Sequence, residues 1–160
     1  MKDAGSAAPG SRIKAVRVRT AHAAGGQGVG SDNLTTRPAA YYSQPELWEL
    51  SRYEKDAAQR ERIQTVISLI PAGVDSILDV GCGNGFVTRQ LPARRVVGLD
   101  FSAEALAHFE GEAVLGSCDH LPFSDRSFDL VACMEVIEHL EPEAFMRTVK
   151  ELARVAKSHV

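Results

Sequence analysis

The chain has 160 residues, of which 44% are hydrophobic and 24% are charged, a composition typical of one soluble globular domain. Its formal net charge of −3 gives no overall basic field, so a nucleic acid would need a local basic patch to bind. No apolar stretch reaches the ~20 residues of a membrane-spanning helix, so we expect no membrane partner. Three cysteines without CxxC spacing argue against a disulfide framework and a thiolate zinc site, and favour a cytoplasmic location.

Residues 1–40 differ in composition from the rest of the chain. They are rich in Ala, Gly and Ser and carry a net charge of +4, which leaves −7 for residues 41–160. Because so few apolar side chains cannot offset the entropy of ordering, we predict a disordered basic tail over residues 1–40. An Arg-rich organellar transit peptide is the alternative, although the segment has no convincing amphipathic helix.

The folded domain is predicted to span residues 41–160 and to open with helices over 44–70. Ser43 and Glu46 have the spacing of a capping box, and Pro45 suits a first helical turn, so a helix is predicted to start near Gln44. A second helix is predicted to end at residues 71–73. Its apolar stripe, which needs a sheet to pack on, consists of Ile63, Val66, Ile67 and Ile70.

Four short apolar runs predict buried parallel strands, because they are too short for helices and too uniformly apolar for a sheet with one wet face. These runs are residues 76–80, 96–99, 113–116 and 128–133. Helices are predicted between and after them, over residues 86–91, 103–109 and 142–156. Since strand and helix alternate, the predicted fold class is α/β, a Rossmann-like three-layer sandwich with a parallel sheet.

The most informative local pattern is a strand that runs into a glycine-rich turn, where residues 77–86 read ILDVGCGNGF. Its glycines allow a tight turn and a close approach of a ligand, and the helix expected next offers free N–H groups. Asp100 ends the following strand, fifteen residues past Gly85, where a carboxylate can accept both hydroxyls of a ribose. Together these features predict a nucleoside site, whereas an isolated GxGxG turn is also compatible with a plain strand-to-helix connection.

The glycine spacing separates two nucleoside cofactors. A dinucleotide fingerprint has Gly-x-Gly-x-x-Gly, but Phe86 takes the third glycine position here, which disfavours the alternative of an NAD-dependent oxidoreductase. With Asp79 ahead of it, the Gly-x-Gly-x-Gly pattern resembles the first motif of the class I S-adenosylmethionine-dependent methyltransferases of type 11. The resemblance covers about residues 75–157, and it continues through GSCDHLPF at 116–123, SFDLV at 127–131 and MEVIEHL at 134–140.

This resemblance implies S-adenosyl-L-methionine as the cofactor. In the glycine loop, Asp79 would order the turn, and the backbone of Gly81, Cys82 and Gly83, followed by Gly85, would contact the methionine moiety. The Cys82 thiol is interpreted as a small filler and not as a reactive group.

The resemblance also assigns the nucleoside end of the cofactor. Asp100 would bind the ribose hydroxyls, and Phe101 would lie against the adenine. Asp119 would accept from the adenine amino group, and the His120 backbone N–H would face a ring nitrogen, since one acceptor and one donor identify an adenine edge. The alternative for Asp119 is a turn cap.

The expected reaction is transfer of the methyl group to a small-molecule acceptor, which needs alignment more than acid–base chemistry. If the acceptor is a hydroxyl, a base must take its proton, and Glu138 and His139 are the nearest titratable candidates. The alternative is that Glu138 caps and His139 packs.

We predict no metal, although one pattern leaves a cation site open as an alternative. Glu135, Glu138 and His139 have i, i+3, i+4 spacing, which would place them on one helix face as part of a divalent-cation site. The pattern resembles the metal-binding segment of the small-RNA 2′-O-methyltransferases, and a similar string occurs in the quinone-biosynthesis O-methyltransferases.

Tyr41, Tyr42 and Trp48 are interpreted either as an aromatic lid over the cofactor and acceptor or as packing for an N-terminal helix. The resemblance implies seven strands, so we expect the chain to stop at the start of the fifth. The fourth strand would then have an unpaired apolar edge, which favours self-association or a partner chain. A non-catalytic S-adenosylmethionine-binding fragment or pseudoenzyme is therefore an alternative function.

Overall fold

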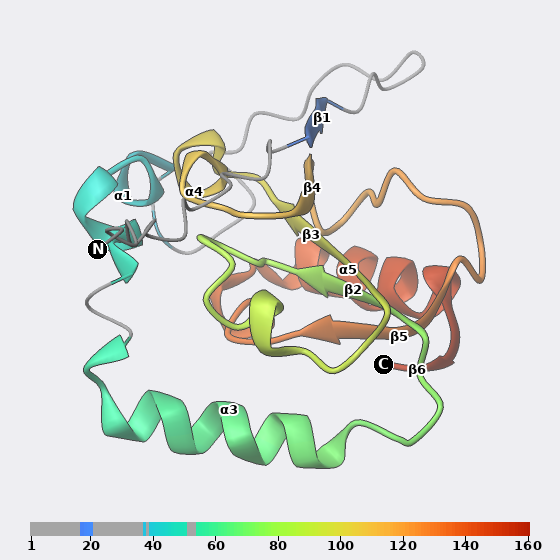
Figure 1. The fold of residues 1–160 in the computed structure, drawn as a ribbon. Coiled ribbons are helices and arrows are strands. Elements are labelled where there is room, and N and C mark those ends of the chain that lie inside the picture. The colour runs from blue at the N-terminus through green and yellow to red at the C-terminus, as the bar shows by residue number, and fades with distance from the viewer. Residues whose placement is uncertain (1–16, 21–36, 38, 51–53) are drawn as a thin grey trace, which may run out of the picture.

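The computed structural model describes residues 17–20, 37, 39–50 and 54–160. A parallel sheet with strand order β1-β4-β3-β2-β5-β6 lies at its centre (Figure 1). The strands are β1 Arg17–Thr20, β2 Ser76–Val80, β3 Arg95–Asp100, β4 Glu112–Leu115, β5 Phe128–Cys133 and β6 Ala156–His159. The helices are α1 Ala39–Tyr42, α3 Ala57–Leu69, α4 Ala103–Ala107 and α5 Pro142–Val155, with 3-10 helices η2 Pro45–Trp48, η3 Thr88–Gln90 and η4 Ile137–His139. The predicted α/β fold is confirmed, and each predicted strand forms to within one residue at either end.

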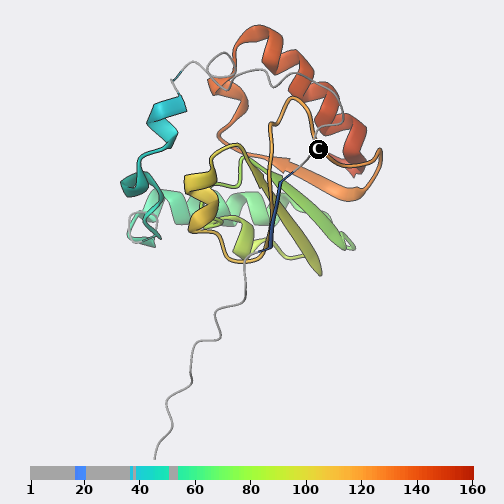
Figure 2. The same ribbon diagram turned by 90° about the horizontal axis from the view of Figure 1, so that it is seen from above.

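The sheet is covered on both faces, as uniformly apolar strands require (Figure 2). Strand β2 lies between β3 and β5, and its Leu78 pairs with Val97 on one side and Val131 on the other. Leu78 packs into a core that includes Leu152 of α5, whereas Ile77 packs into a separate cluster. This alternation follows from the two-residue period of a strand and places α5 on one face of the sheet.

Two of the predicted helices start at identifiable caps. In α3, the Asp56 carboxylate accepts from the backbone N–H groups of Ala58 and Gln59. In α4, the Ser102 hydroxyl accepts from the backbone N–H of Ala105 at 3.1 Å. Each side chain satisfies donors that a helix N-terminus leaves without intrahelical partners.

Two predicted helices are 3-10 helices instead. The segment at Gln44 forms only η2, with no side-chain cap at Gln44, and the carbonyl of its last residue, Trp48, accepts from the Asn84 side chain at 2.8 Å. The segment 86–91 forms only η3. Its last residue, Leu91, precedes a proline and is extended, as expected for a residue in that position.

The last helix ends within one residue of its predicted end and a further strand follows it as expected, but the prediction of an unpaired sheet edge is wrong. Helix α5 ends at Val155, and β6 pairs in parallel with β5 through the registers Phe128↔Ala156 and Leu130↔His159. The edge of the fourth predicted strand is therefore not open over this stretch. Lys157 of β6 adds an ion pair, in which its Nζ lies 2.8 Å from Oδ1 of Asp129.

Strand β1 lies within the segment predicted to be disordered. It pairs in parallel with β4, from Arg17↔Glu112 to Thr20↔Leu115. Most of the remaining residues of 1–40 lie outside the described part of the chain, so the tail stays a prediction there. Within the described residues, no helix has the length and apolar character needed to cross a membrane.

Candidate functional site

A cavity of about 270 Å³ lies where the carboxyl ends of β2 and β3 lead into their loops. Seven of the predicted site residues line it, namely Asp79, Gly81, Cys82, Gly83, Asp100, Phe101 and His139. Gly85, Asp119, His120 and Glu138 are not among its lining residues. The sheet thus brings the glycine loop and the acid of the next strand to one place.

Two of the loop positions require glycine. Gly81 has φ +77°, and a Cβ there would lie 2.2 Å from Cγ2 of Val136. Gly83 has φ +54°, and a Cβ there would lie 2.9 Å from Cζ3 of Trp48. Both backbone conformation and close packing therefore exclude a side chain, and the loop lies tightly between two other segments.

The N–H groups at the start of the glycine loop have acceptors within the protein. Gly81 and Cys82 both donate to the Leu99 carbonyl, at 2.7 and 3.1 Å. Gly83 donates to Oδ2 of Asp100 at 2.8 Å. These three hydrogen bonds fix the turn against the end of β3.

Asp100 connects the end of β3 to the glycine loop. Its side chain is buried, Oδ2 accepts from Gly83, and Oδ1 accepts from the Ser102 backbone N–H at 2.8 Å. Burial raises the pKa of this carboxyl, and the backbone hydrogen bonds oppose that effect. Since each carboxylate oxygen has two lone pairs, Asp100 can still accept from a pair of hydroxyls.

Residues 78–159 match a methyltransferase domain family. The chain belongs to the class I S-adenosylmethionine-dependent methyltransferases. The family's cofactor is S-adenosyl-L-methionine.

Two relatives of the chain show how much of a whole family member it spans. A probable S-adenosylmethionine-dependent methyltransferase of Mycobacterium tuberculosis is 35% identical over 51% of this chain and 31% of its own length. The ubiquinone biosynthesis O-methyltransferase of Albidiferax ferrireducens is 27% identical over 58% of this chain and 42% of its own length. The chain thus spans between 31% and 42% of these two curated relatives.

Solved structures share the fold. The PH0226 protein of Pyrococcus horikoshii is 26% identical with a TM-score of 0.60, over 74% of this chain and 60% of that one. The methyltransferase solved in complex with the Haloferax volcanii Trm112 methyltransferase activator is 28% identical with a TM-score of 0.55, over 74% of this chain and 53% of that one.

A buried hydrogen bond fixes the end of β2, directly before the glycine loop. Thr88 Oγ1 donates to Oδ2 of Asp79 at 2.6 Å, and both side chains are buried. Burial raises the pKa of Asp79 to about 6, although the Thr88 hydrogen bond opposes the rise. Sequence reasoning found Asp79 but missed Thr88, which no motif singles out.

An aromatic segment covers one side of the cavity. The Tyr42 carbonyl accepts from Trp48 Nε1 at 2.9 Å and from the Ser102 hydroxyl at 3.0 Å. The Tyr42 ring also meets Phe101 edge to face, with centroids 5.1 Å apart. Tyr42 and Trp48 line the cavity and Tyr41 does not, so the lid interpretation fits the first two residues.

Asn84 is the loop residue that sequence reasoning missed. Its Nδ2 donates to the Trp48 carbonyl at 2.8 Å, and its Oδ1 accepts from the Phe86 backbone N–H at 3.0 Å. The side chain is buried, so it joins the aromatic segment to the glycine loop. A polar residue between two loop glycines was the available signal.

The Cys82 thiol has the surroundings of a small filler. It is buried, and a Cβ placed on Gly98 would lie 2.6 Å from its sulfur. Burial raises the pKa of the thiol, so Cys82 stays protonated and unreactive at neutral pH.

The residues expected on the adenine side, Asp119 and His120, have hydrogen-bond partners within the protein. Asp119 Oδ1 accepts from the Ser117 hydroxyl at 2.5 Å, and Oδ2 lies 2.9 Å from the Arg147 guanidinium. The His120 N–H donates to the Ser117 carbonyl at 3.3 Å. Cys118 lines the cavity beside them, whereas the adenine roles of Asp119 and His120 stay predictions.

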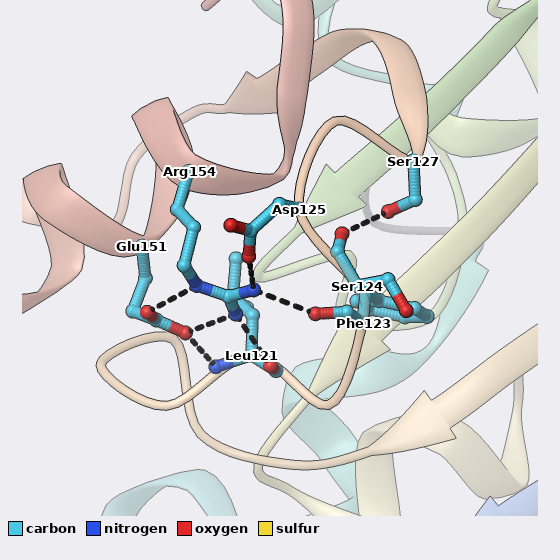
Figure 3. Close-up of polar contacts among 7 residues, drawn as sticks. All are labelled: Leu121, Phe123, Ser124, Asp125, Ser127, Glu151 and Arg154. Atoms are coloured by element: carbon cyan, nitrogen blue, oxygen red, sulfur yellow. Dashed lines mark hydrogen bonds and ion pairs between the residues drawn. The ribbon is translucent and has the colours of Figure 1, made fainter.

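The loop that follows these residues is held against α5 by Arg154 (Figure 3). The guanidinium donates to the carbonyls of Leu121 at 3.0 Å and Phe123 at 2.8 Å, and to the carboxylate of Asp125 at 2.8 Å. Glu151 pairs with Arg154 and also accepts from the Leu121 N–H, both at 2.7 Å. Arg154 lowers the pKa of Glu151, so the pair remains ionised and fixes the loop between His120 and β5.

The segment after β5 does not form the helix face that a cation site would need. Glu135 has φ +56°, only Ile137–His139 form η4, and Glu135 Oε1 lies 2.7 Å from the Arg62 guanidinium. In the described part of the chain, no three His, Cys, Asp or Glu side chains group as metal ligands. His139 lines the cavity, while Glu138 is exposed to solvent.

Proposed function

We propose that the chain binds S-adenosyl-L-methionine in this cavity and transfers its methyl group to a small-molecule acceptor. The observation that carries the proposal is the hydrogen bond from Gly83 to buried Asp100. This bond joins the glycine loop to the carboxylate that is expected to bind the ribose. Asp100 would accept from the ribose hydroxyls, and Phe101 would lie against the adenine. The backbone of Gly81, Cys82 and Gly83 would contact the methionine moiety.

The chemistry at this site depends on alignment more than on a strong base. The bound cofactor supplies a methyl group on a sulfonium, which is already an activated leaving group. The protein's part is to hold the donor and acceptor in line, and Tyr42, Trp48 and Val136 are among the residues that line the cavity.

For a hydroxyl acceptor, we assign the base to His139. It lines the cavity, whereas the other candidate, Glu138, is exposed and does not. An imidazole nitrogen at this position can accept the hydroxyl proton as a general base. The O-methyltransferase named among the relatives supports a hydroxyl acceptor.

We also propose that the protein binds a partner chain. One structural relative is solved with a methyltransferase activator, which supports an accessory protein here. The expected open edge on β5 does not supply its binding surface, because β6 pairs with that strand.

Isothermal titration calorimetry of the full chain with S-adenosylhomocysteine tests cofactor binding. We expect saturable binding that Asp100→Ala abolishes and that NAD does not reproduce. Transfer of a labelled methyl group, reduced in His139→Gln, would then establish catalysis. Binding without turnover would select the alternative of a non-catalytic S-adenosylmethionine-binding protein, and binding of NAD alone would refute the proposal.

A further inference from the structure

The charged side chains of Asp, Glu, Lys or Arg type that line the cavity are all acidic. Three carboxylates line it, those of Asp79, Asp100 and Glu135, and in the described part of the chain no lysine or arginine does. Its first three loop N–H groups are also occupied by protein acceptors. An acceptor molecule that carries a negative charge would therefore meet no lysine or arginine among the described residues that line the cavity.

Of these carboxylates, Glu135 is the one whose side chain is exposed, so an acceptor molecule can reach it. Asp79 is buried against Thr88, and Asp100 is engaged by the glycine loop. Glu135 is 64% exposed at its side chain and has a backbone conformation that is uncommon outside glycine. A strained residue at the wall of a ligand cavity is a candidate for a functional role.

The position of Glu135 places it close to the expected site of methyl transfer. Its neighbour Val136 packs directly on Gly81, where a Cβ would come within 2.2 Å of Cγ2. Gln59 of α3 lines the cavity as well, one helical turn before Arg62, which pairs with Glu135. This ion pair lies in solvent, with side chains 58% and 64% exposed, and such pairs are weak enough to exchange for another cation.

Aromatic side chains also line the cavity. Tyr42, Trp48 and Phe101 line it and are held together by hydrogen bonds and an edge-to-face contact. Aromatic rings together with a carboxylate attract organic cations, by cation–π attraction and by charge pairing.

We propose that the acceptor is an amine-bearing organic molecule and that Glu135 selects it by charge. The inference rests on the proposed methyltransferase function and names the class of its second substrate. Glu135 exchanges Arg62 for the ammonium of the acceptor, while Tyr42 and Trp48 contact its apolar part.

Trp48 makes the proposal measurable, because it is the single tryptophan of the chain and lines the cavity. The full chain is first saturated with S-adenosylhomocysteine, which has no sulfonium charge, and its fluorescence is then titrated with three probes of similar shape. These are 2-phenylethylamine, 2-phenylethanol and phenylacetate. We expect the amine to bind most tightly and phenylacetate most weakly.

The variant Glu135→Gln removes the charge and keeps the shape. It should weaken amine binding about threefold to fivefold, the size of a partly exposed charge pair, and leave the alcohol unchanged. Glu141→Gln, an exposed acid on the same segment that does not line the cavity, is the matched control and should match the wild type.

Failure of the proposed function and failure of the amine proposal would give different results. If S-adenosylhomocysteine does not bind, the proposed function itself fails. If it binds and phenylacetate binds as tightly as the amine, or no probe changes the fluorescence, or Glu135→Gln leaves the amine affinity unchanged, the amine proposal is overturned alone.

Discussion

The hydroxyl of Thr88 donates a 2.6 Å hydrogen bond to the carboxylate of Asp79, and both groups are buried below the glycine loop. No motif links these two residues, which lie nine positions apart. Burial disfavours the charged form of the Asp79 carboxyl, and the hydrogen bond from Thr88 stabilises that charged form. We therefore expect the glycine loop above Asp79 to depend on this hydrogen bond.

Replacing Thr88 by valine should therefore destabilise the protein in a pH-dependent way. The variant keeps the volume and removes the donor, and we expect the free energy of unfolding to fall by about 1–3 kcal/mol at pH 8. The loss should be smaller at pH 5, where Asp79 is largely protonated. Urea denaturation at both pH values measures this, with Thr88→Ser as the control that keeps the hydroxyl. An equal loss at both pH values would contradict the assignment.

The unfolding free energy of the wild type should also depend on pH because of Asp79. The pKa of Asp79 is about 6 in the folded state against an ordinary 3.8, so between these values the folded protein binds more protons than the unfolded chain. The contribution of Asp79 to the unfolding free energy should thus decrease as the pH rises through this window, by about 3 kcal/mol in all.

Asp129 and Glu151 have lowered pKa values and produce the opposite slope. The measurement is therefore the difference between the wild type and Asp79→Asn in urea denaturation from pH 4 to 7. A difference that does not change with pH would show that Asp79 titrates normally.

The sequence predicted the strands well because their signal is local. Buried parallel strands such as 76–80 and 128–133 must be apolar along their whole length, and that pattern is visible without any partner. Asp100 was found for a similar reason, since its position follows from the end of a strand and a known distance from a glycine turn.

The features that were missed depend on contacts between distant segments. The Asn84 side chain binds the Trp48 carbonyl across 36 positions, and the Leu99 carbonyl takes two N–H groups of the glycine loop. Neither contact has a sequence pattern. The strand at 156–159 was expected only as the start of a fifth strand, and its pairing with β5, which covers the edge predicted to be open, was missed.

Gly81 should be intolerant of alanine for two separable reasons. Its φ of +77° is unfavourable for any residue with a Cβ, and the Cβ would also lie 2.2 Å from Val136. The first effect costs about 1–2 kcal/mol and the second adds to it. The double variant Gly81→Ala/Val136→Ala should relieve the clash and recover part of the stability and of S-adenosylhomocysteine affinity. If Gly81→Ala alone behaves like the wild type in both measurements, the packing of Val136 on the loop is not as described.

Asp129 should hold three strands together at one end of the sheet. Its carboxylate accepts from Ser76 of β2 at 2.7 Å and from Lys157 of β6 at 2.8 Å, and these bonds lower its pKa. A lowered pKa means that the stabilisation is present above the ordinary value and is lost as the pH falls through the lowered one. Asp129→Asn should therefore unfold at lower urea than the wild type at pH 7, and the difference should narrow in acid. A constant difference would assign the effect to packing instead of charge.

Arg154 offers a direct test of what fixes the loop between the adenine-side residues and β5. Its guanidinium reaches two carbonyls and two carboxylates, and Arg126 of that loop is exposed with φ +51°. Arg154→Met keeps the apolar stem of the side chain and removes every donor. We expect a loss of about 2 kcal/mol in unfolding free energy and faster cleavage by trypsin after Arg126, detected by mass spectrometry.

The matched control for this test is Arg147→Met on the same helix, which loses only the ion pair with Asp119. It should leave cleavage after Arg126 near the wild-type rate, because it does not contact residues 121–127. Arg154→Lys should give an intermediate rate, since a single ammonium cannot reach all of the acceptors that the planar guanidinium spans. If both methionine variants expose the loop equally, the loop is held by general packing of α5, and the hydrogen bonds of Arg154 are not what positions it.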